Sequence, residues 1–459
     1  MPSSELLLSP RDIGRSGLCI GCGGCASQLP GISLELDAYG QFKPAGEGAA
    51  KRSATLTRVC PFSPAAANED QIGTALFPDA PHDPQLGRWE AAFVGAVTEP
   101  GFRDSGSSGG LTSWVICELL QRGLIDGVAH VGPREGNGDE KLFGYRISRT
   151  VEDIRARAKS RYFPVEMSGV LDEIRRVPGR YAVVGIPCFI KAVNLLRRED
   201  AVLRERIVFT VGLVCGHMKS ARMAESFTWQ LGARMEEVER FDFRRKDTSR
   251  PANWYRTEAA LRSGETRAED WWNLADGDWG AGFFQNPACN FCDDVVAETA
   301  DIVFGDAWVE PYQNDGRGTN VGVVRNKQLQ RILAEAQAEG RISIEEVDAD
   351  FVVRTQAAGF RQRREGLAYR LAHRWHGIMP VKRVAPRHDS LPWRRKLVYR
   401  MRQTISRWSH RVFWLARTTG QPKLYTGWAK RTLRLYQALT YSRGRLGAWI
   451  DRVAAFTSR

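Results

Sequence analysis

Residues 181–198 read YAVVGIPCFIKAVNLLRR, a short apolar run followed at once by a segment with helical spacing. A continuous apolar run of this length is typical of a strand buried on both faces. The same order recurs twice: AAFVGAV at 91–97 precedes a helical pattern that begins at 111, and IVFTVGLV at 207–214 precedes CGHMKSARMAESFTWQLG. Strands that alternate with helices predict an α/β core built on a largely parallel sheet.

This topology also indicates where ligands bind, because parallel sheets bind them beyond the carboxyl ends of their strands. The SGG segment at 108–110, Cys188 and Cys215 each follow a predicted strand. We therefore expect all three at one edge of the sheet, provided that none of these strands runs antiparallel. Further short strands are predicted at 128–131, 301–306 and 321–324.

The length and composition are those of a globular protein. The chain has 459 residues, of which 43% are hydrophobic and 26% charged, so it has room for two or three domains. We expect a small N-terminal module at 1–88, an α/β core at 89–350 and a helical extension at 351–459. No run of about 18 uninterrupted apolar residues occurs, and the first residues lack the basic start of a secretory signal. The expected location is therefore the cytoplasm.

The positive charge is concentrated at one end of the chain. The net charge is +13, yet residues 381–459 alone carry 19 Lys and Arg side chains against only Asp389 and Asp451. The remainder is slightly acidic. Trp393, Trp408 and Trp414 are interspersed with the arginines. Aromatic and basic residues on helices favour attachment to an anionic membrane surface. Docking of an acidic partner protein is the second interpretation, and nucleic-acid binding is not expected because no recognised motif is present.

The nine cysteines are clustered, which in a reducing compartment favours metal ligands over disulfides. Cys19, Cys22 and Cys25 form a C-x2-C-x2-C run with glycines between them, a spacing that lets a backbone wrap around an iron–sulfur cluster. No fourth cysteine follows directly, so we assign Cys60, which precedes Pro61, as the remaining ligand. The pattern predicts a ferredoxin-like iron–sulfur module; a zinc site with four cysteines is the alternative.

A second cysteine set has a weaker signal. Cys289 and Cys292 form a single C-x2-C pair, whereas Cys188 and Cys215 stand alone at predicted strand-to-helix junctions. We interpret the four as ligands of a second cluster, with reactive thiols and ordinary buried cysteines as the alternatives. Cys117 lies within a predicted helix and is interpreted as a core residue.

With these motifs in view, the chain resembles the family of coenzyme F420 hydrogenase/dehydrogenase beta subunits, which is related to 7-hydroxymethyl chlorophyll a reductase. The resemblance covers roughly residues 15–330. It is carried by CIGCGGC at 19–25, SGSSGGLTSWVICELLQRGLIDGV at 105–128, KSRYFPV at 159–165, GIPCFIKAV at 185–193, CG at 215–216, CNFCDD at 289–294, ADIVFGDAW at 300–308 and GTNVGVVR at 318–325. Ser-Arg-Tyr at 160–162 departs from the commoner Ser-Lys-Tyr, and the basic tail is a further departure.

The resemblance implies FAD together with one or two 4Fe-4S clusters, because a flavin exchanges hydride as well as single electrons. The expected FAD pyrophosphate site is the helix start formed by Ser107, Ser108, Gly109 and Gly110. Further expected cofactor or substrate contacts are Lys159, Arg161, Tyr162 and Asp306, and His217 is a candidate proton donor. Ordinary structural roles for all of these residues remain open alternatives.

Together these patterns predict an iron–sulfur flavoprotein oxidoreductase. Electrons would come from a partner such as ferredoxin or a reduced F420-type deazaflavin. They would reduce a small organic substrate, for example a glycan intermediate of polysaccharide biosynthesis. A non-catalytic electron-transfer subunit and a zinc-stabilised binding protein are the alternatives. No G-x-G-x-x-G fingerprint for a nicotinamide follows a strand.

Overall fold

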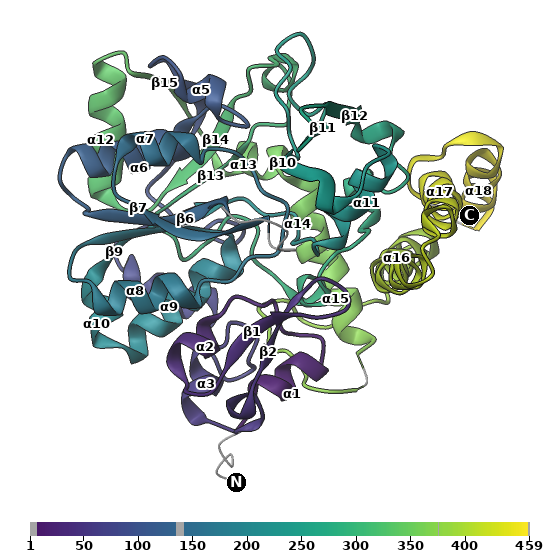
Figure 1. Ribbon diagram of the computed structural model, residues 1–459, viewed down its shortest axis with the longest axis horizontal. Coiled ribbons are helices and arrows are strands. Elements are labelled where there is room, and N and C mark those ends of the chain that lie inside the picture. Colours follow the sequence, from purple (N-terminus) through teal and green to yellow (C-terminus); the bar gives the residue numbers. More distant parts are fainter. Residues whose placement is uncertain (1–6, 135–141, 375, 458–459) are drawn as a thin grey trace.

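The protein is built around an eight-stranded sheet with the strand order β15-β5-β14-β13-β9-β8-β6-β7 (Figure 1). The structure is a computed structural model that describes residues 7–134, 142–374 and 376–457. In chain order, the strands are β5 (Ala91–Val97), β6 (Gly127–Pro133), β7 (Phe143–Ser148), β8 (Tyr181–Gly185), β9 (Ile207–Leu213), β13 (Ile302–Asp306), β14 (Asn320–Val324) and β15 (Ile342–Val347).

The four central strands β13, β9, β8 and β6 pair in parallel, and β7, β14 and β15 run the other way. Since β5 shares the direction of the central strands, five of the eight strands run the same way. The predicted α/β core with its largely parallel sheet is thus confirmed. Antiparallel neighbours such as β6 and β7 need no crossover between them, whereas the parallel neighbours do.

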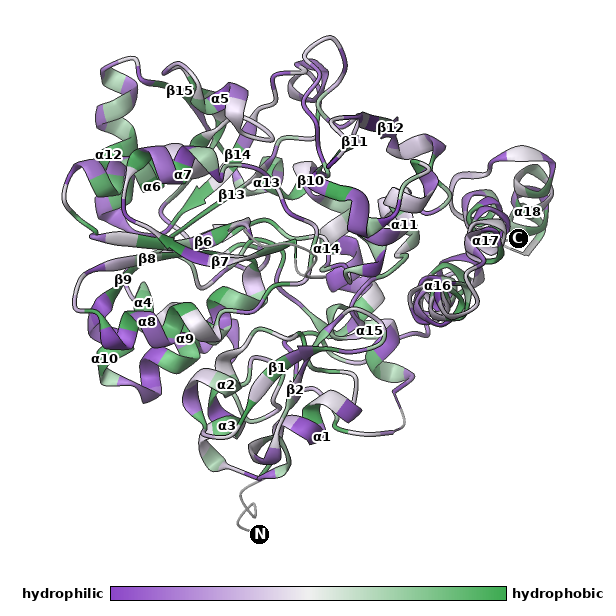
Figure 2. Ribbon diagram, in the orientation of Figure 1, coloured by the Kyte–Doolittle hydropathy of each residue, from purple (hydrophilic) through white to green (hydrophobic). Residues whose placement is uncertain are grey.

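Helices cover both faces of the sheet, which is why its central strands are mostly apolar (Figure 2). The side chains of β8 alternate: Val184 faces one hydrophobic cluster and Val183 the other. One face packs against α6 (Leu111–Gln121), α7 (Val151–Ala156) and α12 (Lys327–Ala338), and the other against α8 (Ser168–Arg176), α9 (Pro187–Glu199) and α10 (Ala201–Arg206).

The N-terminal segment packs beneath the α8 and α9 side of the sheet (Figure 1). Leu18 belongs to the same hydrophobic cluster as Phe189 of the core and Leu371 of the C-terminal extension, so these parts share one core. The division of the chain into three domains remains a prediction. The elements of this segment are α1 (Pro10–Arg15), α2 (Gly24–Gln28), β1 (Ser33–Leu36), β2 (Phe42–Ala45), α3 (Ala54–Val59), α4 (Glu69–Leu76), β3 (His82–Asp83) and β4 (Gly87–Arg88).

The C-terminal extension is helical and ends in three helices at one side of the molecule (Figure 1). Within the described residues, no helix has both the length and the apolar character needed to cross a bilayer. Its helices are α13 (Ala349–Thr355), α14 (Ala357–Arg363), α15 (Glu365–Ala372), α16 (Trp393–Thr418), α17 (Pro422–Tyr441) and α18 (Gly444–Thr457). The remaining elements are α5 (Phe102–Ser105), α11 (Arg222–Gln230) and a small antiparallel sheet of β10 (Val238–Asp242), β11 (Arg256–Leu261) and β12 (Thr266–Asp270).

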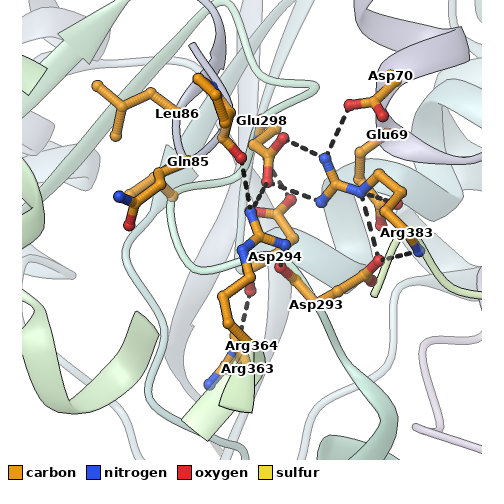
Figure 3. A network of polar contacts seen from close by, with 12 residues as sticks. Glu69, Asp70, Gln85, Leu86, Asp293, Asp294, Glu298, Arg363, Arg364 and Arg383 are labelled. Carbon is orange, nitrogen blue, oxygen red and sulfur yellow. Dashed lines mark hydrogen bonds and ion pairs between the residues drawn. The ribbon is translucent and has the colours of Figure 1, made fainter. Parts of the chain in front are cut away.

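A buried ionic network joins the extension to the rest of the chain (Figure 3). Arg383 donates two hydrogen bonds to Glu298, at 2.5 and 2.8 Å, and one to Asp70 of α4 at 2.9 Å. Its Nε also lies 3.3 Å from Asp293 Oδ2, and Lys382 Nζ lies 3.2 Å from Asp293 Oδ1. Buried charges are tolerated only when they are paired in this way.

We predict that Arg383→Gln strongly destabilises the protein, because it removes both Arg383 hydrogen bonds to the buried Glu298 and leaves that carboxylate with Arg364, 3.8 Å away. Removing one partner of a buried pair costs about 3–5 kcal/mol, and the loss should appear as a lower midpoint of urea unfolding. Arg58→Gln is the control, because Arg58 pairs with Glu199 on the surface and such pairs contribute only about 0.2–1 kcal/mol. Equal midpoints for the two variants would contradict the prediction.

Candidate functional site

A cavity of about 590 Å³ lies at the carboxyl ends of the parallel strands. It is lined at successive strand ends by Val131, Gly185, Cys215 and Asp306, and by the SGSSGG loop (105–110) that follows β5. The structure therefore confirms that this loop and Cys215 share one edge of the sheet. Cys188 follows β8 at the same edge but does not line the cavity.

The SGSSGG loop presents the start of α6 to this cavity. Ser107, Ser108 and Gly110 line it, and Gly110, the residue before α6, has a left-handed φ of 86°. Gly109 has a packing role instead: a Cβ there would lie 2.7 Å from Asn320 Oδ1. The same Asn320 oxygen accepts a hydrogen bond from the Leu111 amide at 3.1 Å, so part of the helix start is already satisfied.

The predicted Lys159-Arg161-Tyr162 segment forms a wall of the cavity rather than a solvated helix end. Lys159 Nζ lies 3.2 Å from Asp242 Oδ2. Arg161 stacks over Phe143 at 4.9 Å, and its buried Nε has no hydrogen-bond partner in the part of the chain that the structure describes. Burial lowers the pKa of the Arg161 guanidinium. Arg161 also lines a second cavity of about 530 Å³ on the other side of the segment. A buried cation of this kind is suited to an anionic group.

Aromatic side chains and an ion pair line another part of the cavity. The Tyr162 ring lies 4.8 Å from that of Trp279. Asp306 is held by Arg244, with Nη1 2.9 Å from Oδ2, and Arg244 in turn stacks 4.1 Å over Tyr255. Asp306 thus forms an ion pair at the cavity, and its predicted contact with a cofactor or substrate stays a prediction. Flat aromatic walls beside fixed charges suit a planar polar ligand.

His217 and Lys219 lie buried against the same Trp279. The imidazole stacks on the indole at 4.3 Å, and its Nε2 has no hydrogen-bond partner within residues 7–134, 142–374 and 376–457. Burial, and then the charge of Lys219, hold the pKa of His217 well below its ordinary value, so this side chain is neutral. Lys219 donates to the Phe283 carbonyl at 2.7 Å, and burial lowers its pKa to about 7. Sequence reasoning missed Lys219.

The first cysteine set gathers around one small cavity, lined by Cys19, Cys22, Cys25 and Cys60. Burial, and then the neighbouring Cys19, raise the pKa of Cys60 to about 11, although backbone hydrogen bonds from Phe62 and Ser63 oppose the rise. The pKa values of Cys22 and Cys25 are also raised, and all four thiols are close enough to influence one another. Buried thiolates need a nearby positive charge, which cluster iron provides, so the donor set fits an iron–sulfur cluster.

The second set also converges. Burial, then Cys292, Cys215 and Cys289, raise the pKa of Cys188, which places the four thiols within electrostatic range of one another. Met218 donates its amide to Cys289 Sγ at 3.3 Å, as expected around cluster sulfurs. Cys22 of the first set also acts on Cys188, so the two sets are neighbours. Cys117 is instead a buried core residue within α6.

No three His, Cys, Asp or Glu side chains among the described residues converge tightly enough to bind one metal ion. A four-iron cluster offers each thiolate a different iron atom, so its ligands stand farther apart than those of a single ion. The ligand assignments themselves remain predictions.

Two family models match the chain, and both describe the beta subunit of coenzyme F420 hydrogenase/dehydrogenase. Residues 92–172 match the model of its N-terminal part, and residues 179–350 match the model of its C-terminal part. Over 107 residues, the chain is 29% identical to the F subunit of F(420)H(2) dehydrogenase from Methanosarcina mazei. That region is 23% of this chain and 29% of the relative, so the chain spans less than a third of the relative's length.

A solved structure with a similar arrangement is a chain of the F420-reducing NiFe hydrogenase complex from Methanosarcina barkeri. The two chains are 18% identical with a TM-score of 0.49, over 64% of this chain and 96% of that chain.

We predict that Arg244 and Asp306 act as a coupled pair at the cavity. Arg244→Gln and Asp306→Asn should each lower the free energy of unfolding, measured by urea unfolding. The loss in the double variant should be smaller than the sum of the two single losses by at least about 1 kcal/mol. The neighbouring pair Arg245 and Glu258, in which Arg245 is exposed, is the control and should show coupling below about 1 kcal/mol. Strict additivity for Arg244 and Asp306 would contradict the prediction.

Proposed function

The chain belongs to the family of coenzyme F420 hydrogenase/dehydrogenase beta subunits, and we propose that it is an oxidoreductase that passes electrons between 4Fe-4S clusters and FAD. One observation carries the proposal: a single cavity extends from the SGSSGG loop at the start of α6 to Cys215 of the second cysteine set. A ligand held by the loop thus reaches one of the thiols proposed to bind a cluster.

FAD is the ligand proposed for this cavity. Ser107, Ser108 and Gly110 would hold its pyrophosphate at the start of α6, where backbone amides favour anions. Arg161 would supply the positive charge that a phosphate or a reduced flavin requires, since its buried Nε has no hydrogen-bond partner among the described residues. When bound, FAD would supply both hydride and single-electron exchange.

The aromatic part of the cavity is the proposed place of the redox-active ring. Tyr162 and Trp279 form its walls, and the buried His217 presents an Nε2 without a partner. As a neutral imidazole, His217 would donate or accept a hydrogen bond at the ring. Lys219 lies beside the same indole at 4.7 Å and adds a positive charge. These two side chains would orient the ring and stabilise negative charge on it.

The positions of the two cysteine sets indicate the order in which electrons would pass between the proposed cofactors. Cys22 and Cys188 lie within electrostatic range of each other, and Cys215 lines the flavin cavity. Electrons from a donor such as ferredoxin or a reduced F420-type deazaflavin would pass between the clusters and the cavity. The substrate would be a small organic molecule, for example a glycan intermediate.

The basic helices α16–α18 are proposed to attach the protein to an anionic membrane surface. On α16, one exposed stripe carries Trp393, Leu397, Arg400, Arg407, Trp408, Arg411 and Trp414. Trp449 and Arg452 are exposed in the same way on α18. Aromatic rings suit the lipid headgroup layer, while arginines are attracted to anionic lipids.

The proposal is tested by anaerobic purification of the whole chain. We expect a brown protein with about one FAD and about eight irons per chain. Cys22→Ser should remove about four irons while flavin remains bound, because the first set lies outside the flavin cavity. Cys117→Ala is the matched control and should keep both cofactors.

The remaining outcomes separate the alternatives. A colourless chain that contains zinc would overturn the redox function. Reduction of flavin by dithionite without turnover of any organic substrate would favour an electron-transfer subunit over an enzyme. Unchanged iron in Cys22→Ser would reject the first ligand set.

We predict that the full chain sediments with phosphatidylcholine vesicles only when they contain phosphatidylserine, and less so at high salt. Arg407→Gln with Arg411→Gln should weaken vesicle binding roughly thirtyfold, since each basic residue contributes about 1 kcal/mol. Lys327→Gln with Arg331→Gln on α12, away from α16 (Figure 1), is the control. Equal losses for both double variants, or no vesicle binding by the wild-type chain, would contradict the membrane proposal.

A further inference from the structure

Arg363, the last residue of α14, connects the two backbone segments that carry three cysteines of the second set. Its Nη1 donates to the Gly216 carbonyl at 2.7 Å, and Gly216 follows Cys215. Its Nε donates to the Asp294 carbonyl at 2.7 Å, and the Cys292 thiol contacts that same carbonyl at 3.4 Å. One guanidinium therefore fixes the spacing between these segments.

The positive charge of Arg363 lies near the sulfur atoms of the second cysteine set. Burial by itself would lower its pKa, but Cys292, Cys215 and Cys289 raise it above the ordinary value. The side chain is only 4% exposed. Both of its hydrogen bonds described above go to uncharged carbonyls beside Cys215 and Cys292, so its positive charge lies next to the second cysteine set without being neutralised by these two partners.

The other arginines nearby are used differently. Arg383 is neutralised by Glu298, and Arg364 lies 3.8 Å from the same carboxylate (Figure 3). Arg370 donates to the Asn290 carbonyl at 2.7 Å, in the turn between Cys289 and Cys292. The C-terminal extension thus supplies two buried arginines to the second cysteine set. Both lie beyond residue 350, where the family match ends.

We propose that Arg363 is a positioning residue that raises the reduction potential of the cluster bound by Cys188, Cys215, Cys289 and Cys292. This inference rests on the proposed function, which places a cluster there. Reduction adds one electron to the cluster and no proton, so the cluster gains one negative charge. A fixed positive charge in a buried, weakly polarisable site stabilises the reduced form more than the oxidised form. Arginine keeps its proton throughout.

The test is a dithionite titration of the holoprotein with redox mediators, monitored by electron paramagnetic resonance. We expect Arg363→Gln to make reduction of the second cluster about tenfold less favourable, which is about 59 mV for one electron. Arg363→Lys should retain most of the wild-type potential because it keeps the charge. Arg361→Gln on the same helix is the matched control because Arg361 is exposed, and the cluster of the first set is an internal reference; neither potential should change.

The outcomes separate this inference from the proposed function. A wild-type chain with about four irons would refute the second cluster before any variant is made. With eight irons present, an unchanged potential in Arg363→Gln overturns the role of Arg363. Arg363→Gln could instead lose about four irons. In that case, retention of all eight irons by Arg363→Lys supports a role for the positive charge. Loss of iron from both variants overturns that role, because Arg363 would then only hold the two backbone segments together.

Discussion

The parallel pairing of β6, β8, β9 and β13 is the constraint on which the rest of the structure depends. Because these strands point the same way, their carboxyl ends meet at one edge, and helices close both faces of the sheet. The edge is then the natural place for a large cavity. Segments far apart in the chain, such as those at Ser107, Cys215 and Asp306, meet at this edge because each lies at the end of its own strand.

Buried charge is the second organising feature, and the chain handles it in two ways. Arg383 is neutralised by carboxylates from α4 and the core, which fastens the extension to both. Arg363 is bonded to carbonyls and faces thiols instead. Ion pairing with carboxylates is enough to explain the burial of Arg383. For Arg363, the proposed anionic partner is a thiolate-bound cluster.

The C-terminal extension is therefore more than a basic tail. Its first helices, α14 and α15, reach the second cysteine set, while α16–α18 expose arginine and tryptophan at the surface. One continuous segment thus joins the proposed electron-transfer centre to the proposed membrane surface. Helix α16 is tied into the body by Ser409, whose hydroxyl accepts a hydrogen bond from the Phe284 amide at 2.9 Å.

The local pattern by itself determined the strands at 91–97 and 181–185 and the position of Cys215, because apolar periodicity and strand-to-helix order are local properties. Lys159 was recognised as a binding candidate, but its pairing with Asp242 was not. Lys219, Arg244 and Arg363 were missed, since their partners lie many residues away and leave no mark on the local sequence. Tertiary structure alone decided which cations were neutralised and which were left facing a cavity or a thiol.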